Sequence, residues 1–140
     1  MKKRHKNPRE VRLKFCGGVR TVTGSNHLLI TPKSEILIDA GLFYGHREEF
    51  YEVNTRFSYP LQKVDALVLS HAHIDHCGNI PTLYKHGLRC KVYTTSATRD
   101  LCKLMLADSG RVQAEDYRYL AKIARSTRGR RRPHHREPFN

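Results

Sequence analysis

The chain has 140 residues and a formal net charge of +13, from 26 Lys and Arg against 13 Asp and Glu. This length excludes more than one ordinary domain, and the absence of any apolar run near the roughly 20 residues that span a bilayer predicts a soluble, cytoplasmic protein. The four cysteines have no C-x-x-C spacing, which excludes a structural zinc knuckle and favours reduced, mostly buried thiols.

The first half of the chain has the alternation and the turns of a meander of short antiparallel strands. The strands expected here are residues 11–15, 19–23, 26–31 and 35–39. Residues 42–60 have no clear period and predict a loop with one helical turn. A further apolar run at 64–70 predicts a strand, and continuous apolar runs of this kind predict strands that are covered on both faces.

The second half predicts alternating helix and strand. The expected elements are a short helix at 80–86 that Gly87 ends, a strand at 90–94, a helix from Ser96 or Thr98 to Gly110, and a last helical stretch at 112–124. From residue 125 onward the composition turns to Arg, Pro and His. The chain therefore divides into a basic amino-terminal tail at 1–11, a folded part at 12–124 and an Arg-rich carboxy-terminal tail at 125–140.

The positive charge is concentrated at the two ends. Seven Lys or Arg lie in residues 1–14 and eight in residues 117–140, whereas the span between holds eleven basic and eleven acidic residues. Basic ends on a neutral domain are typical of proteins that bind polyanions, because neutralised phosphates release counterions. A pair of solvated tails accounts for the same charge pattern equally well.

The strand at 64–70 leads directly into His71-Ala72-His73-Ile74-Asp75-His76. Side chains two apart on an extended chain point the same way, so His71 and His73 can bind one cation. Asp75 and His76 follow where the chain turns and can reach a second cation. Two adjacent zinc ions would activate water for attack on an ester, amide or phosphodiester. The motif therefore predicts a zinc site in which Asp75 is also the candidate catalytic residue; a fortuitous histidine-rich turn is the disfavoured alternative.

Asp39 ends a neighbouring strand at a comparable height. An acid in this position can accept a hydrogen bond from a metal ligand and fix the orientation of that ligand. The residue pattern alone fits an ordinary strand-terminating aspartate equally well.

Four segments resemble, in chain order, the amino-terminal part of the β-CASP branch of the metallo-β-lactamase superfamily, a branch of RNA-processing nucleases. They are residues 21–25 (TVTGS), 36–43 (ILIDAGLF), 65–81 (DALVLSHAHIDHCGNIP) and 97–101 (ATRDL). The resemblance implies an α/β fold that is a partial αββα sandwich, its first half, over residues 12–124. It also implies that His71 and His73 bind the first zinc, that Asp75 and His76 contribute to the second, and that Asp39 is the supporting acid.

Members of this branch also use a later histidine, a bridging aspartate and a carboxy-terminal histidine, all beyond the matched region. His134 and His135 stand in an Arg-rich stretch without strand flanks, so we do not expect them to be ligands. The resemblance thus implies a truncated chain with under-coordinated metals and an exposed sheet edge. One expectation is that a partner chain supplies the missing half of the fold.

The expected function is zinc-dependent cleavage of RNA phosphodiesters that this chain does not complete alone. One alternative is a non-catalytic remnant that binds metal or nucleic acid. Another is a hydrolase of small thioesters or lactams, against which the basic ends argue.

Overall fold

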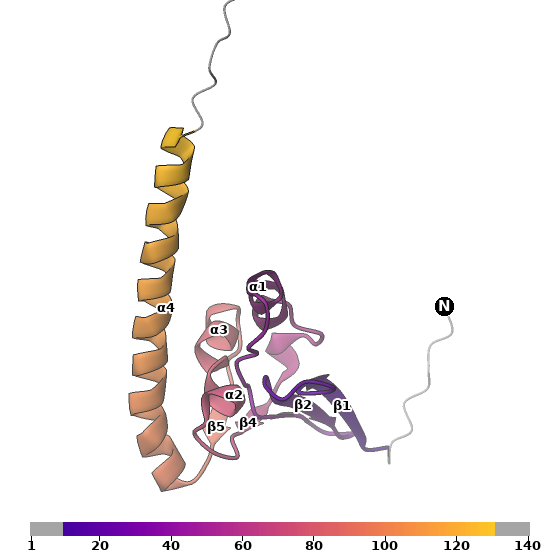
Figure 1. Ribbon diagram of the computed structural model, residues 1–140. Coiled ribbons are helices and arrows are strands. Elements are labelled where there is room, and N and C mark those ends of the chain that lie inside the picture. Colours follow the sequence, from indigo (N-terminus) through magenta and orange to yellow (C-terminus); the bar gives the residue numbers. More distant parts are fainter. Residues whose placement is uncertain (1–9, 131–140) are drawn as a thin grey trace, which may run out of the picture. The chain divides into compact units, whose positions relative to one another are not determined.

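The computed structural model describes residues 10–130, which form two compact units that divide between Ala107 and Asp108 (Figure 1). His134, His135 and most of the two basic ends lie outside the described residues. Within the described part of the chain, no helix is long and apolar enough to cross a membrane. The first unit is built on a five-stranded mixed sheet, and the second is helical.

The sheet has the strand order β1-β2-β3-β4-β5. The strands are β1 (Arg12–Gly17), β2 (Asn26–Ile30), β3 (Glu35–Ile38), β4 (Ala66–Val68) and β5 (Lys91–Tyr93). The first three strands pair antiparallel, whereas β3 with β4 and β4 with β5 pair parallel. Because parallel strands end at the same edge of a sheet, the residues after β3 and β4 meet there.

The helices of the first unit lie in the connections between the strands. They are α1 (Arg47–Thr55), the 3-10 turn η1 (Leu61–Lys63), α2 (Ile74–Cys77) and α3 (Ile80–Lys85), and the start of α4 (Ser96–Arg130) follows β5. The short helix expected at 80–86 is confirmed, and Gly87 follows it at a φ of 113°. The segment 42–60, expected to hold one helical turn, contains the nine-residue α1 instead.

The strand expected at 19–23 is wrong: these residues form bends in the loop between β1 and β2. Gly18 and Arg20 have positive φ values of 68° and 60°, which turn the chain out of the extended conformation that strand pairing needs. The other expected strands are confirmed, with bounds that differ by one to two residues at most of their ends.

One face of the sheet carries the core. Leu28, Leu37 and Leu67 lie opposite one another on β2, β3 and β4, and each is at most 2% exposed. They share a buried cluster with Cys77 at the end of α2 and Leu83 of α3. The apolar faces of α2 and α3 are therefore buried on this side of the sheet, which fixes the segment that holds the histidines.

The opposite face of the sheet is apolar and open. Its central row runs from Phe15 through His27, Ile38 and Val68 to Tyr93, all in register across the five strands. Phe15, Val68 and Tyr93 are 63%, 42% and 55% exposed. The expectation that the apolar strands are covered on both faces is thus wrong for the described residues. An apolar run indicates which side chains avoid water. It does not indicate whether residues of the same unit cover both faces of the strand.

The helix expected to end at Gly110 runs on through it, and α4 is continuous from Ser96 to Arg130. The ending at Gly110 is therefore wrong, and the helix also continues past residue 125, where the Arg-rich tail is expected to begin. A glycine inside an exposed helix costs only about 1 kcal/mol relative to alanine, which is too little to end a long helix. Arg111 also forms ion pairs with Asp108 and Glu115 on the turns either side of the glycine.

A Gly110→Ala variant tests this continuity. No atom lies within 4 Å of the position that the added Cβ would occupy. We expect the free energy of unfolding of the helix to rise by about 0.5–1 kcal/mol, because alanine removes the entropic penalty of glycine. Thermal unfolding followed by circular dichroism at 222 nm measures the change. A lower melting temperature would show that Gly110 ends the helix after all.

Candidate metal centre

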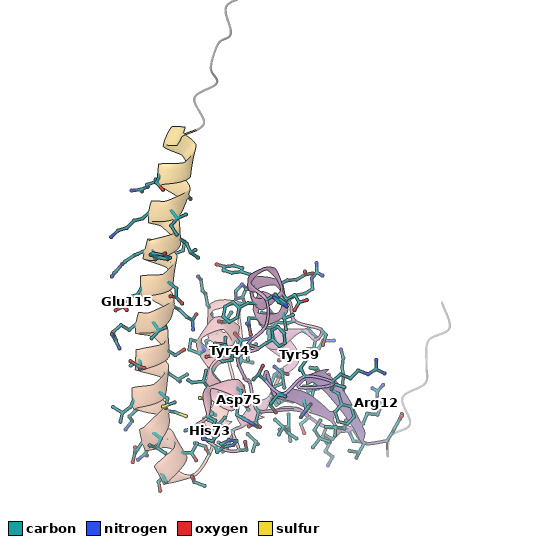
Figure 2. All side chains as sticks on the ribbon, viewed as in Figure 1. Arg12, Tyr44, Tyr59, His73, Asp75 and Glu115 are labelled. Atoms are coloured by element: carbon teal, nitrogen blue, oxygen red, sulfur yellow. The ribbon has the colours of Figure 1, made fainter. Side chains whose placement is uncertain are left out.

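The predicted ligands lie at the edge of the sheet where β3 and β4 end (Figure 2). The Asp39 backbone N–H donates to the carbonyl of Val68 at 2.9 Å, which extends the pairing of these two strands by one residue. Asp39 has a φ of 57°, a conformation that aspartate adopts more readily than most residues. The register of β3 and β4 therefore brings Asp39 beside the segment that begins at Ser70.

The backbone of the metal motif is held by the segment that follows β3 and by Ser25, which precedes β2. The N–H groups of Ser25, Ala40 and Leu42 donate to the carbonyls of Asp75, His76 and Ile74, at distances of 2.8–3.0 Å. Gly41 lies between two of these donors and packs directly on the motif, since a Cβ there would be 1.6 Å from the Asp75 carbonyl oxygen. These contacts fix the backbone of Asp75 and His76 and do not use their side chains.

The four predicted ligands come together as two pairs of donor atoms. His71 Nε2 lies 3.1 Å from His73 Nδ1, and His76 Nε2 lies 3.6 Å from Asp75 Oδ2. The two pairs adjoin, because the ring centroids of His71 and His76 are 4.1 Å apart. Among residues 10–130 no three His, Cys, Asp or Glu side chains form a group that could hold one ion. The geometry thus brings the four side chains together as two adjoining pairs.

Asp39 contacts the second pair through His76 and is 4% exposed. Its Oδ2 accepts a hydrogen bond from His76 Nδ1 at 2.8 Å and another from the Ser70 hydroxyl at 2.9 Å. Its Oδ1 accepts from the Ser70 backbone N–H at 2.8 Å. The more distant Ser25 hydroxyl also points to Oδ2, at 3.4 Å. This arrangement is what the predicted supporting role of Asp39 requires, since Asp39 holds a predicted ligand by the nitrogen that faces away from the metal position.

Sequence reasoning missed Ser25 and Ser70, which complete the hydrogen bonding of Asp39. Ser70 immediately precedes the first histidine of the motif, and Ser25 closes the Thr-Gly-Ser turn. Their positions next to recognisable motifs were the only available signal. A serine in a loop has so many ordinary roles that its type alone does not indicate this one.

Cys77 directly follows the motif but is not suited to be a ligand. Burial, with a smaller contribution from the neighbouring Cys102, raises the pKa of its thiol to about 12. A thiol with this pKa stays protonated at neutral pH, whereas zinc binds the thiolate. Cys77 instead packs in the core, as the expectation of buried, reduced cysteines states.

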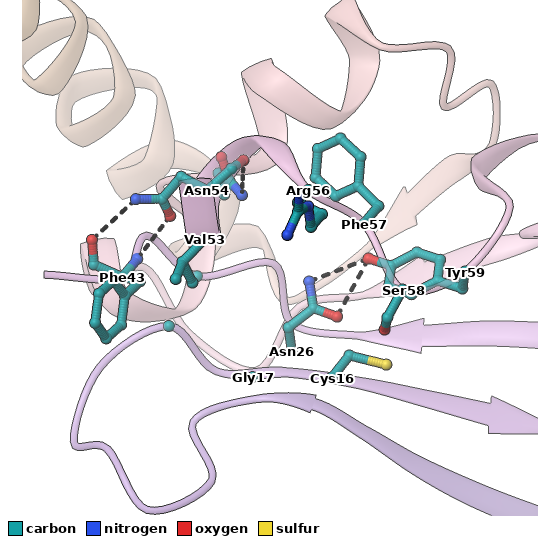
Figure 3. Close-up of a pocket in the computed structure, with 13 residues that line it drawn as sticks. Cys16, Gly17, Asn26, Phe43, Val53, Asn54, Arg56, Phe57, Ser58 and Tyr59 are labelled. Carbon is teal, nitrogen blue, oxygen red and sulfur yellow. Dashed lines mark hydrogen bonds between the residues drawn. The ribbon is translucent and has the colours of Figure 1, made fainter. Parts of the chain in front are cut away.

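A small pocket lies beside the motif, between the β1–β2 connection and α1 (Figure 3). Its polar lining includes Asn54 and the pair of Asn26 and Tyr59, which hydrogen-bond to each other at 3.1–3.2 Å. Burial raises the pKa of Tyr59 to about 12, against a smaller lowering by the hydrogen bond from Asn26. The pocket volume of about 30 Å³ is room for about two water molecules. The donor pairs at the sheet edge are therefore the candidate site.

Comparisons with known proteins show the family of this chain. A family model described as the metallo-beta-lactamase superfamily matches residues 20–105. Ribonuclease TTHA0252 of Thermus thermophilus is 40% identical over 101 residues, which are 72% of this chain and 23% of the relative. Transcription termination factor FttA of Methanosarcina mazei is 40% identical over 111 residues, which are 76% of this chain and 17% of the relative.

A solved structure, a metallo-beta-lactamase with the HARLDQ motif from Cronobacter sakazakii, is also similar. It has a TM-score of 0.44 and 25% identity, and the match covers 65% of this chain and 34% of that chain. The present chain spans less than a quarter of the length of the two curated relatives. The fold is α/β and corresponds to part of the metallo-β-lactamase sandwich. The chain belongs to the metallo-β-lactamase superfamily and matches the amino-terminal part of its β-CASP branch.

Proposed function

We propose that this chain is the metal-binding part of a zinc-dependent hydrolase that cleaves RNA phosphodiester bonds. The proposal rests on the two adjoining pairs of donor atoms at one sheet edge. His71 Nε2 lies 3.1 Å from His73 Nδ1, and His76 Nε2 lies 3.6 Å from Asp75 Oδ2. Imidazole nitrogen and carboxylate oxygen are ligands that zinc accepts, so the residues fit the metal. Bound zinc would supply Lewis-acid activation of water and of the scissile group.

The roles of the chain's own residues follow from this arrangement. His71 and His73 would hold one ion, and Asp75 and His76 would hold the other. Asp39 would keep the His76 ring in place through the hydrogen bond to Nδ1. Asp75 is the proposed catalytic residue because its carboxylate is the acidic member of the donor pairs among the described residues.

RNA is the proposed substrate on two grounds. One curated relative bears the name ribonuclease and the other the name transcription termination factor. The chain also carries a formal net charge of +13, which favours binding to a polyanion. Together these observations favour an RNA phosphodiester over a small thioester or lactam.

We also infer that a partner chain completes the site. Catalytic zinc sites use about three protein ligands for each ion, whereas each donor pair supplies two. The open apolar face that carries Phe15, Val68 and Tyr93 would be covered by such a partner. Contiguous apolar surface of this kind marks interaction sites on soluble proteins.

A His73→Ala variant tests the proposed function. We expect zinc affinity to fall at least about tenfold, because one of the two donors to the first ion is lost. His46→Ala is the matched control, since His46 is an exposed histidine away from the motif. Zinc affinity is measured by competition with a chelator, and turnover with labelled single-stranded RNA, a lactam and a thioester.

The outcomes separate the alternatives. Zinc-dependent RNA cleavage that His73→Ala abolishes and His46→Ala retains would support the proposal. Hydrolysis of the lactam or the thioester, with RNA left intact, would favour the small-substrate alternative. Zinc binding without turnover of any substrate would favour a non-catalytic metal-binding chain. Equal zinc affinity in both variants and the unsubstituted chain would contradict the assignment of His73.

A further inference from the structure

The side chain of Ser70 lies between the acid and both donor pairs. Ser70 follows β4 and precedes His71, and its hydroxyl oxygen is 2.9 Å from Asp39 Oδ2 and 2.9 Å from His71 Nδ1. His76 Nδ1 is more distant from it, at 3.5 Å. No role for this serine follows from the donor pairs alone.

The direction of these hydrogen bonds follows from the number of protons. A serine hydroxyl has one proton to donate, and an ionised carboxylate can only accept. The 2.9 Å contact with Asp39 therefore uses the Ser70 proton. The equally short contact with His71 Nδ1 is then favourable only if that nitrogen carries a proton and donates it to the serine oxygen.

This direction determines which nitrogen of His71 can bind a metal. A neutral imidazole with its proton on Nδ1 has its lone pair on Nε2. Nε2 is the atom that lies 3.1 Å from His73 Nδ1, in the first donor pair. We propose that Ser70 is a positioning residue that links Asp39 to His71 and holds His71 in the tautomer that presents Nε2 to the first metal.

Asp39 contacts the second donor pair directly. His76 Nδ1 donates directly to Asp39 Oδ2 at 2.8 Å, which leaves His76 Nε2 on the side of Asp75. One carboxylate thus orients a histidine in each pair, directly for His76 and through Ser70 for His71. This role rests on the proposed metal site, but the tautomer itself is a property of the metal-free chain.

Two variants of Ser70 test the role of its hydroxyl group. Ser70→Ala removes the link and keeps the backbone N–H that donates to Asp39 Oδ1 at 2.8 Å. Ser70→Thr keeps the hydroxyl. Ser109→Ala is the matched control, because it removes a serine hydroxyl from α4, where this hydroxyl accepts a hydrogen bond from Gln113 Nε2 at 3.1 Å.

The tautomer of His71 is read from the nitrogen-15 shifts of its ring in the metal-free chain, at about pH 8.5, above the ordinary histidine pKa. We expect the Nδ1–H form in the unsubstituted chain, in Ser70→Thr and in Ser109→Ala, and a population shifted toward Nε2–H in Ser70→Ala. Zinc affinity should fall about 10- to 100-fold in Ser70→Ala alone, the range found for lost partners of metal-bound histidines.

An unchanged His71 tautomer in Ser70→Ala would overturn the proposal, as would an unchanged zinc affinity. An unsubstituted chain with His71 in the Nε2–H form would overturn it as well. Failure of the metal site is distinguishable from these results. A chain that binds no zinc contradicts the proposed function, while the tautomers of the metal-free variants still decide the role of Ser70.

Discussion

A Gly41→Ala variant is expected to lose several kcal/mol of stability together with its metal affinity. The added Cβ would lie 1.6 Å from the carbonyl oxygen of Asp75, 2.3 Å from its carbonyl carbon and 2.8 Å from the Ser25 nitrogen. All three are backbone atoms, so no rotation of a side chain relieves the overlap. Overpacking in a well-ordered interior costs about 1–3 kcal/mol and more where the backbone must move. Urea unfolding and zinc competition measure the two losses.

Gly110→Ala is the matched control, because the same substitution in α4 meets no atom within 4 Å. The contrast between the two glycines tests whether the segment after β3 packs on the metal motif. A Gly41→Ala chain as stable as the unsubstituted one would show that this close packing does not exist.

An Asp39→Asn variant is expected to lower zinc affinity about 10- to 100-fold, because the partner of His76 and Ser70 changes from a carboxylate to an amide. The substitution keeps the shape of the side chain. Asparagine also tolerates the positive φ of 57° at this position, so the backbone is not strained. Loss of charge-assisted hydrogen bonds in a buried site adds about 1–3 kcal/mol of destabilisation.

Asp100→Asn serves as the control for Asp39→Asn. Asp100 pairs with Arg99 and Lys103 on the exposed surface of α4, where replacement should leave zinc affinity unchanged. The zinc affinity of both variants is measured under the same conditions by chelator competition. Equal affinities would mean that Asp39 holds the strand ends together and does not orient the ligands.

The sequence was most informative where the physical signal is local. The apolar runs predicted β3 and β4, and Gly87 predicted the end of α3, because strand burial and a left-handed helix end each need particular residues at one place. The strand at 19–23 failed because Arg20 adopts a positive φ that its residue type does not signal. The helix end predicted at Gly110 was wrong because a glycine permits a helix end without requiring one.

The site was predictable as a set of residue types and only partly as a geometry. The motif gave His71, His73, Asp75 and His76, since four metal-binding side chains within six residues seldom occur by chance. The supporting hydrogen bonds join Asp39 to Ser70, 31 positions away, through the pairing of β3 and β4. Such contacts depend on strand register, which the hydrophobic pattern of short strands does not fix for individual side chains.

Zinc titration of the purified chain, followed by the nitrogen-15 signals of its histidine rings, tests the metal site most directly. We predict that Nε2 of His71, Nδ1 of His73 and Nε2 of His76 shift on zinc addition. The rings of His27, His46 and His86, which lie outside the donor pairs, should stay unchanged. Signals of the three motif histidines that do not respond to zinc, or that move no more than those of the other three, would contradict the account.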